Sequence, residues 1–80
     1  MRAKHRAISK AKHAIMQSEE GKISAFALQK IILTTQNTIY RAIIASGAKV
    51  EIGEYRGKPV FYLNWNECEK VINYIYRRGA

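Results

Sequence analysis

Side chains that can hydrogen bond to the edges of nucleic acid bases are concentrated between residues 36 and 41. They are Gln36, Asn37, Thr38, Tyr40 and Arg41. Gln and Asn can bond bidentately to adenine and Arg to guanine, and a good pair gives about 1–3 kcal/mol of discrimination. Arg41 is the strongest candidate, because no acidic residue lies at helical spacing from it. The segment is therefore predicted to contact bases.

The same side chains have structural interpretations that the sequence leaves open. Gln36 and Asn37 could satisfy backbone groups in a turn, and Thr38 could belong to a helix cap. Tyr40 could be half-buried against the first helix. For Arg41 the sequence offers no such structural role.

A second group of cations surrounds a glycine, since Arg56 and Lys58 flank Gly57. A flexible basic turn can lie on phosphates or enter the minor groove, where Arg is favoured. A solvated turn that resists aggregation is the alternative.

The N-terminal segment is also basic and has no acidic residue before Glu19. Phosphate contacts from Arg2, Lys4 and Arg6 would add affinity without specificity. Helical geometry would spread these cations around a cylinder, and a disordered basic arm would supply the same charge.

The composition supports a polyanionic partner. Fourteen Lys and Arg stand against six acidic residues, all Glu, which gives a net charge of +8. Such a protein attracts nucleic acid first and an anionic membrane surface second. The remaining interpretation of this charge is a protein with a basic surface and no anionic partner. Cys68 is the single cysteine, which favours a reducing, cytoplasmic setting, and no apolar run approaches the ~20 residues of a membrane span.

Catalysis, cofactors and metal binding are not expected. His5 and His13 with one distant cysteine do not have the closely spaced pairs of a zinc site. No phosphate-binding loop, paired carboxylates or nucleophile with a neighbouring base is visible. Trp65 and Tyr76 fall on the apolar face of a helix, so packing is favoured over stacking on single-stranded bases.

Hydrophobic periodicity and cap residues predict the elements that position these side chains. We expect helices at 1–18, 25–33 and 36–46 and from Asn64 onward, with Ser24 and Thr35 as N-caps and Gly47 as a stop. Asn64 and Glu67 form a capping-box-like pair. A half-buried strand around Val50 and Ile52 is expected to form a hairpin with strand 60–63, through a turn at 56–59.

Two short helices followed by a hairpin resemble the winged helix-turn-helix family. The likeness covers roughly residues 21–63, and Leu33 stands where the turn of that family usually has Gly. The residues that carry it are Gly21-Lys22-Ile23-Ser24, Leu28, Ile32, Thr35, Thr38-Ile39-Tyr40-Arg41, Ile43, Gly47, Arg56-Gly57-Lys58 and Phe61-Tyr62-Leu63. The resemblance implies that 22–24 is a short strand paired with the wing. In its small size and its eleven Ile residues, the chain resembles winged-helix regulators of archaeal viruses and plasmids.

The sequence therefore predicts one α+β, mostly helical domain over residues 1–80. The resemblance gives it a three-helix core, a two-stranded wing with a short third strand, and a C-terminal helix. The expected function is sequence-specific binding of double-stranded DNA, with helix 36–46 in the major groove and wing 55–59 on the backbone or minor groove. A transcriptional regulator would act as a homodimer, joined through the first or last helix, with recognition helices about 34 Å apart. A non-specific architectural or RNA-binding protein and a protein-interaction adaptor are the alternatives.

Overall fold

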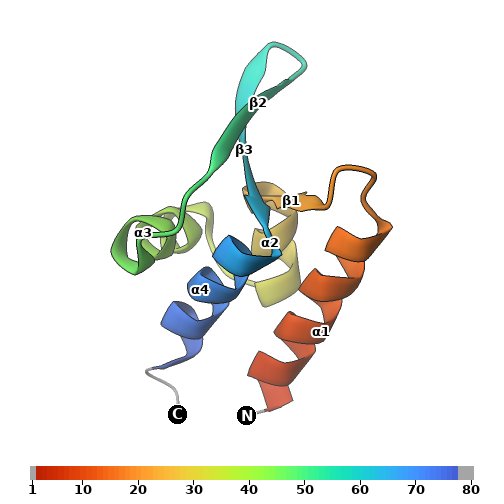
Figure 1. Ribbon diagram of the computed structural model, residues 1–80. Helices are drawn as coiled ribbons and strands as arrows, with labels where there is room; N and C mark the ends of the chain where they lie inside the picture. The colour runs from red at the N-terminus through yellow and green to blue at the C-terminus, as the bar shows by residue number, and fades with distance from the viewer. Residues whose placement is uncertain (1, 78–80) are drawn as a thin grey trace.

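The computed structural model describes residues 2–77, apart from the side chain of Arg2, and contains four helices and a three-stranded antiparallel sheet (Figure 1). The elements are α1 (Arg2–Gln17), β1 (Lys22–Ser24), α2 (Ala25–Ile32), α3 (Gln36–Ser46), β2 (Glu51–Tyr55), β3 (Lys58–Asn64) and α4 (Trp65–Tyr76). The expectation of a mostly helical α+β fold is confirmed, and each expected helix is present.

Local capping explains where three of the helices begin. Ser24 Oγ accepts the Ala27 N–H at 3.0 Å before α2, and Thr35 Oγ1 accepts the Thr38 N–H at 3.2 Å before α3. Asn64 Oδ1 accepts the Glu67 N–H at 3.1 Å before α4. Each bond satisfies a backbone donor that the first helical turn leaves unpaired. The three predicted N-caps are therefore confirmed.

The turn between α2 and α3 is short and ends α2 without glycine. Leu33 adopts the left-handed conformation, with φ 62°, and its side chain is 89% exposed. The Gln29 carbonyl accepts both the Leu33 N–H and the Thr34 N–H, at 2.9 and 3.2 Å. Gly47 adopts the same conformation at the end of α3, as expected.

The sheet has the order β1-β3-β2, with β3 in the centre. Lys22 lies opposite Asn64 and Ser24 opposite Tyr62, so the expected short third strand is confirmed. The hairpin turn differs from expectation. Lys58 already pairs with Tyr55, so the connection contains only Arg56 and Gly57, and Pro59 belongs to β3.

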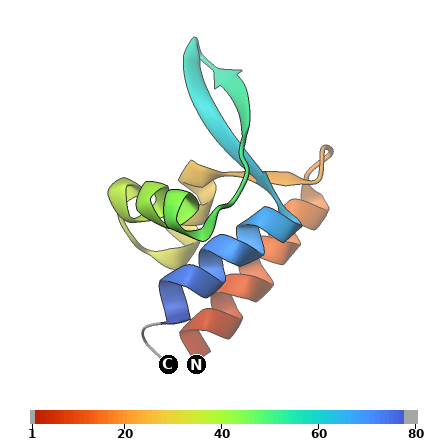
Figure 2. The ribbon, with the colours of Figure 1, turned by 60° about the vertical axis from the view of Figure 1, so that its left-hand side comes forward.

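The core lies between the helices and the lower part of the sheet. Figures 1 and 2 show α1 and α4 side by side with opposite chain directions, and α3 on the other side of α4. Leu28, Ile39, Leu63 and Ile72 are the largest completely buried aliphatic side chains. The apolar face of α4 packs into this core, with Trp65 and Tyr76 partly buried against it, as predicted.

The β2–β3 hairpin projects from the helical body, which corrects the prediction of a half-buried strand. Val50 is half-buried, but Ile52 is 71% exposed, and no residue of β2 is buried. Alternation identified a strand, but no other element covers its apolar face.

Candidate nucleic-acid interface

Asn37 and Arg41 lie one turn apart on the exposed side of α3. Within residues 2–77, neither side chain takes part in a side-chain hydrogen bond or an ion pair. Their amide and guanidinium donors are therefore available to another molecule. The opposite side of α3 buries Ile39, Ala42 and Ile43, which fixes how the helix is rotated.

The other three predicted residues of α3 have partners within the chain. Gln36 Nε2 donates to the Tyr40 hydroxyl at 2.9 Å. Thr38 Oγ1 lies 2.9 Å from Thr35 Oγ1, so its hydroxyl takes part in the N-cap. Thr38 thus has the structural role that the sequence left open, while its side chain remains exposed.

Tyr40 connects α3 to the hairpin rather than to the first helix. Its ring meets Phe61 of β3 edge-on, with the ring centroids 5.5 Å apart and the planes at 65°. Such aromatic pairs contribute about 0.5–1.5 kcal/mol beyond area burial. The contact packs the base of the hairpin against α3.

At the hairpin tip, Arg56 and Gly57 both have positive φ, at 53° and 78°. This is the pattern of a type I′ turn, which matches the twist of a hairpin but disfavours side chains such as Arg. The Arg56 guanidinium lies 5.3 Å from the centre of the Tyr55 ring. Lys58 pairs with Tyr55 and, by alternation along β3, lies on the face opposite Phe61.

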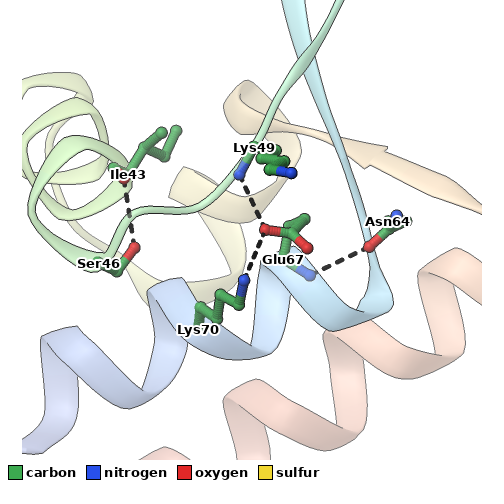
Figure 3. Close-up of polar contacts among 6 residues, drawn as sticks. All are labelled: Ile43, Ser46, Lys49, Asn64, Glu67 and Lys70. Atoms are coloured by element: carbon green, nitrogen blue, oxygen red, sulfur yellow. Dashed lines mark hydrogen bonds and ion pairs between the residues drawn. The ribbon is translucent and has the colours of Figure 1, made fainter.

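Glu67 anchors the segment between α3 and the hairpin to α4 (Figure 3). Its Oε1 accepts the Lys49 backbone N–H at 2.8 Å and the Lys70 ammonium at 3.2 Å. These bonds, the one from the Lys49 N–H first, lower the pKa of the Glu67 carboxyl. The capping-box prediction is therefore wrong for Glu67, whose carboxylate bonds to Lys49 rather than to the backbone of Asn64.

The structure places the first part of α1 away from the hairpin tip, although Lys4 lines a groove with Ala45 and Ser46 at the end of α3. Figures 1 and 2 place the start of α1 at the end of the molecule opposite the tip. Lys4 is half-buried and Arg6 is exposed in that first part of α1. Arg2 begins α1, but its side chain lies outside the described part of the chain.

Acidic side chains are absent from the exposed face of α3. Lys22 forms ion pairs with Glu20 and Glu51, with Nζ–Oε1 distances of 3.1 and 3.4 Å. The bond with Glu20, followed by the bond with Glu51, raises the pKa of Lys22. Glu51 and Glu54 are both exposed on the hairpin, and of these two only Glu51 forms an ion pair within residues 2–77.

Sequence reasoning missed an apolar groove beside this surface. It has a volume of about 300 Å³ and is lined only by apolar and aromatic side chains, those of Tyr40, Ile43, Ile44, Val50 and Phe61. Ile44 is 81% exposed. The sequence did contain a signal that Ile44 would be exposed. Ile44 directly follows the inward-facing Ile43 instead of lying at helical spacing from it.

The described residues include no group of three or more His, Cys, Asp or Glu side chains that could hold a metal ion. Cys68 is completely buried, and burial raises the pKa of its thiol to about 12, so its thiolate is scarce at neutral pH. Over residues 2–77, no helix is both long enough and apolar enough to cross a bilayer.

Comparison with known proteins gave no match. No protein-family profile matches the chain, and neither the curated proteins nor the solved structures include one significantly similar to it.

Proposed function

We propose that this chain is a winged helix-turn-helix protein that binds double-stranded DNA, as a sequence-specific transcriptional regulator. In this proposal α2 and α3 are the helix-turn-helix and β2–β3 is the wing. α3 enters the major groove, and the wing contacts the backbone or the minor groove.

The observation that carries the proposal is the pair of unengaged side chains on α3. In a helix-turn-helix, the N-terminal part of the second helix reaches the base edges. Asn37 and Arg41 lie in that part, are exposed, and have the donors suited to adenine and guanine. Gln36 could join them only by giving up its hydrogen bond to Tyr40.

The hairpin tip adds an argument from backbone strain. A residue other than glycine with positive φ costs about 1–2 kcal/mol, and such strain is often retained at functional sites. Arg56 has this conformation at the most projecting point of the molecule (Figure 2). A wing that inserts arginine between the walls of the minor groove would account for it.

The decisive experiment is selection of bound sequences from random duplex DNA, followed by titration of the selected duplex at stated salt. We expect an enriched motif, and about 10–100-fold weaker binding by Arg41→Ala, equal to the loss of one bidentate base contact. Lys10→Ala, which removes an exposed cation of α1, is the matched control. Equal affinity for every duplex, or equal losses in both variants, would refute sequence-specific binding.

The same titrations separate the alternatives. Tighter binding to RNA duplexes than to DNA would favour an RNA-binding protein. The apolar groove beside Ile44 favours a protein-interaction adaptor. In that case an Arg41→Ala, Arg56→Ala variant would bind its protein partner as well as the wild type does. A homodimer would protect two half-sites about 34 Å apart in footprinting. The apolar face of α4 is already packed in the core, so dimerisation would have to use another surface.

A further inference from the structure

One large apolar side chain on the exposed side of α3 is not explained by packing. Ile44 is 81% exposed, whereas the neighbouring Ile43 belongs to the buried core. The other exposed side chains of α3 are polar or are alanine. A single exposed apolar residue is ordinary on a protein surface and by itself indicates no function. The position of Ile44 on the helix is what makes it informative.

Ile44 shares its side of α3 with the two unengaged polar side chains. Successive residues of an α-helix are rotated by about 100° around its axis, so Asn37, Arg41 and Ile44 lie within about 60° of one another. The buried residues of α3 lie on the opposite side of the helix. The exposed side of α3 therefore presents, from its start toward its end, an amide, a guanidinium and a branched apolar group.

The surface next to Ile44 is also apolar on the side toward the hairpin. The groove of about 300 Å³ beside it is walled by Tyr40, Ile43, Val50 and Phe61, and none of its lining side chains is charged. Contacts to phosphate use cations or N–H donors, and these walls supply no cation. This part of α3 therefore suits an apolar group of a ligand better than a phosphate.

The major groove of DNA presents one such group, because thymine is distinguished there by its C5 methyl. Isoleucine has no side-chain donor or acceptor, so contact with that methyl is how it can discriminate between bases. We propose that Ile44 is a specificity-determining residue that contacts the C5 methyl of a thymine close to the guanine contacted by Arg41. This inference rests on the proposed function and adds a third base to the sequence that α3 recognises.

The rise of the helix determines where that thymine lies. From Arg41 to Ile44 the helix advances by about 4.5 Å, and from Asn37 to Arg41 by about 6 Å. Neighbouring base pairs are stacked about 3.4 Å apart. The thymine should therefore lie within about two base pairs of the guanine contacted by Arg41, on the side away from the base contacted by Asn37.

Uracil substitution tests the contact, because uracil differs from thymine only by lacking the C5 methyl. The guanine contacted by Arg41 is the position at which Arg41→Ala loses its base preference. Each thymine of the selected duplex is then replaced in turn by uracil, and the ratio of the two affinities is measured by titration.

The variants compared with the wild type are Ile44→Ala and Ile44→Val. The matched control is Ile52→Ala, which removes the same atoms from an isoleucine that is 71% exposed on β2. Circular dichroism verifies that each variant is folded, as expected for substitutions at exposed positions.

At one thymine near the Arg41 guanine, uracil should weaken wild-type binding by about three- to fivefold, the effect of returning one methyl group to water. Ile44→Ala should bind the thymine and uracil duplexes equally. Ile44→Val, which keeps both branches at Cβ, should retain most of the discrimination. Ile52→Ala should show the same ratio of affinities as the wild type.

Several outcomes would overturn the inference while leaving sequence-specific binding intact. They are equal wild-type affinity for the thymine and uracil duplexes, an unchanged ratio in Ile44→Ala, and a selected motif with no thymine near the Arg41 guanine. A wild-type dimer that Ile44→Ala abolishes, with an unchanged uracil ratio, would assign Ile44 to a protein interface instead. If selection enriches no motif at all, the proposed function fails, and the methyl contact is refuted with it.

Discussion

Within the described part of the chain, every buried apolar side chain belongs to a helix, to β1 or to the base of β3, and none belongs to β2. The helical body is thus stabilised by a shared core. The hairpin beyond Phe61 relies on cross-strand pairing and a tight turn instead. The residues of the body are constrained by burial, whereas those of the hairpin are constrained by backbone geometry.

This difference explains where free functional groups occur. In the body, polar side chains become available only on the exposed faces of helices, as with Asn37 and Arg41. Most side chains of the hairpin are exposed. The amino acid at its tip is therefore not constrained by core packing and can serve contact with another molecule. Four predictions test this contrast.

The largest difference in stability should appear when an isoleucine is shortened to alanine in the body and, separately, in the hairpin. Ile72 in α4 is completely buried, and Ile72→Ala should lower the free energy of unfolding by about 2–5 kcal/mol. Ile52→Ala on β2 should lower it by less than about 1 kcal/mol, through strand propensity alone. Urea denaturation followed by circular dichroism measures both. Similar losses would show that Ile52 is covered and that the hairpin is not a projecting element.

A smaller effect is expected where the hairpin meets the body. A Cβ at residue 53 would lie 2.7 Å from Cε2 of Tyr62, whose ring also lies 4.9 Å from Lys22 Nζ. Gly53→Ala should displace the ring and lower stability by about 1–2 kcal/mol. In a Tyr62→Leu background the same substitution should have less effect, since the ring is gone. If Gly53→Ala lowers stability equally in the Tyr62→Leu background, a clash with the Tyr62 ring is not the cause.

These contrasts also show what the sequence could predict. Ser24, Thr35 and Asn64 were identifiable as N-caps because a cap depends on residues three positions away. Gly47 was identifiable because a left-handed helix end favours glycine. Local chemistry was sufficient for the starts of α2, α3 and α4 and for the unengaged donors of Asn37 and Arg41.

Contacts between distant residues could not be predicted in this way. Glu67 bonds to Lys49, eighteen positions away, so the three-residue spacing from Asn64 suggested the wrong partner. Ile52 was placed inward because alternation does not reveal what lies opposite a strand. The separation of Lys4 from the hairpin tip depends on how α1 packs on α4, which composition and periodicity do not specify.

At the hairpin tip, stability and the proposed DNA contact should change in opposite directions. Arg56→Asn places a residue favoured in type I′ turns at φ 53° and should raise stability by about 0.5–1 kcal/mol. It should also weaken DNA binding, because the guanidinium is lost. Leu33→Gly is the control, since it relieves the same backbone conformation in the body without removing a charge. Thermal unfolding and duplex titration separate the two effects. Unchanged affinity in Arg56→Asn would argue against a wing contact.

The smallest effect concerns the connection between body and hairpin and depends on pH. Because the folded pKa of Glu67 lies below its ordinary value of 4.5, its carboxylate adds stability above that pH. This contribution is lost as the pH falls through the lower, folded value. Glu67→Gln should therefore make the acid-induced loss of stability shallower below about pH 4.5. Glu19→Gln serves as the control for removing one exposed carboxylate.

Amide exchange locates the same effect within the molecule. The Lys49 N–H donates to Glu67 Oε1 at 2.8 Å, so protonation of the carboxyl should speed its exchange more than that of amides within α4. Exchange at Lys49 that is equally slow in the wild type and in Glu67→Ala, which has no side-chain acceptor, would show that the carboxylate does not hold this segment to α4. In that case the Tyr40–Phe61 contact and the pairing of β1 with β3, rather than the carboxylate, hold the hairpin to the body.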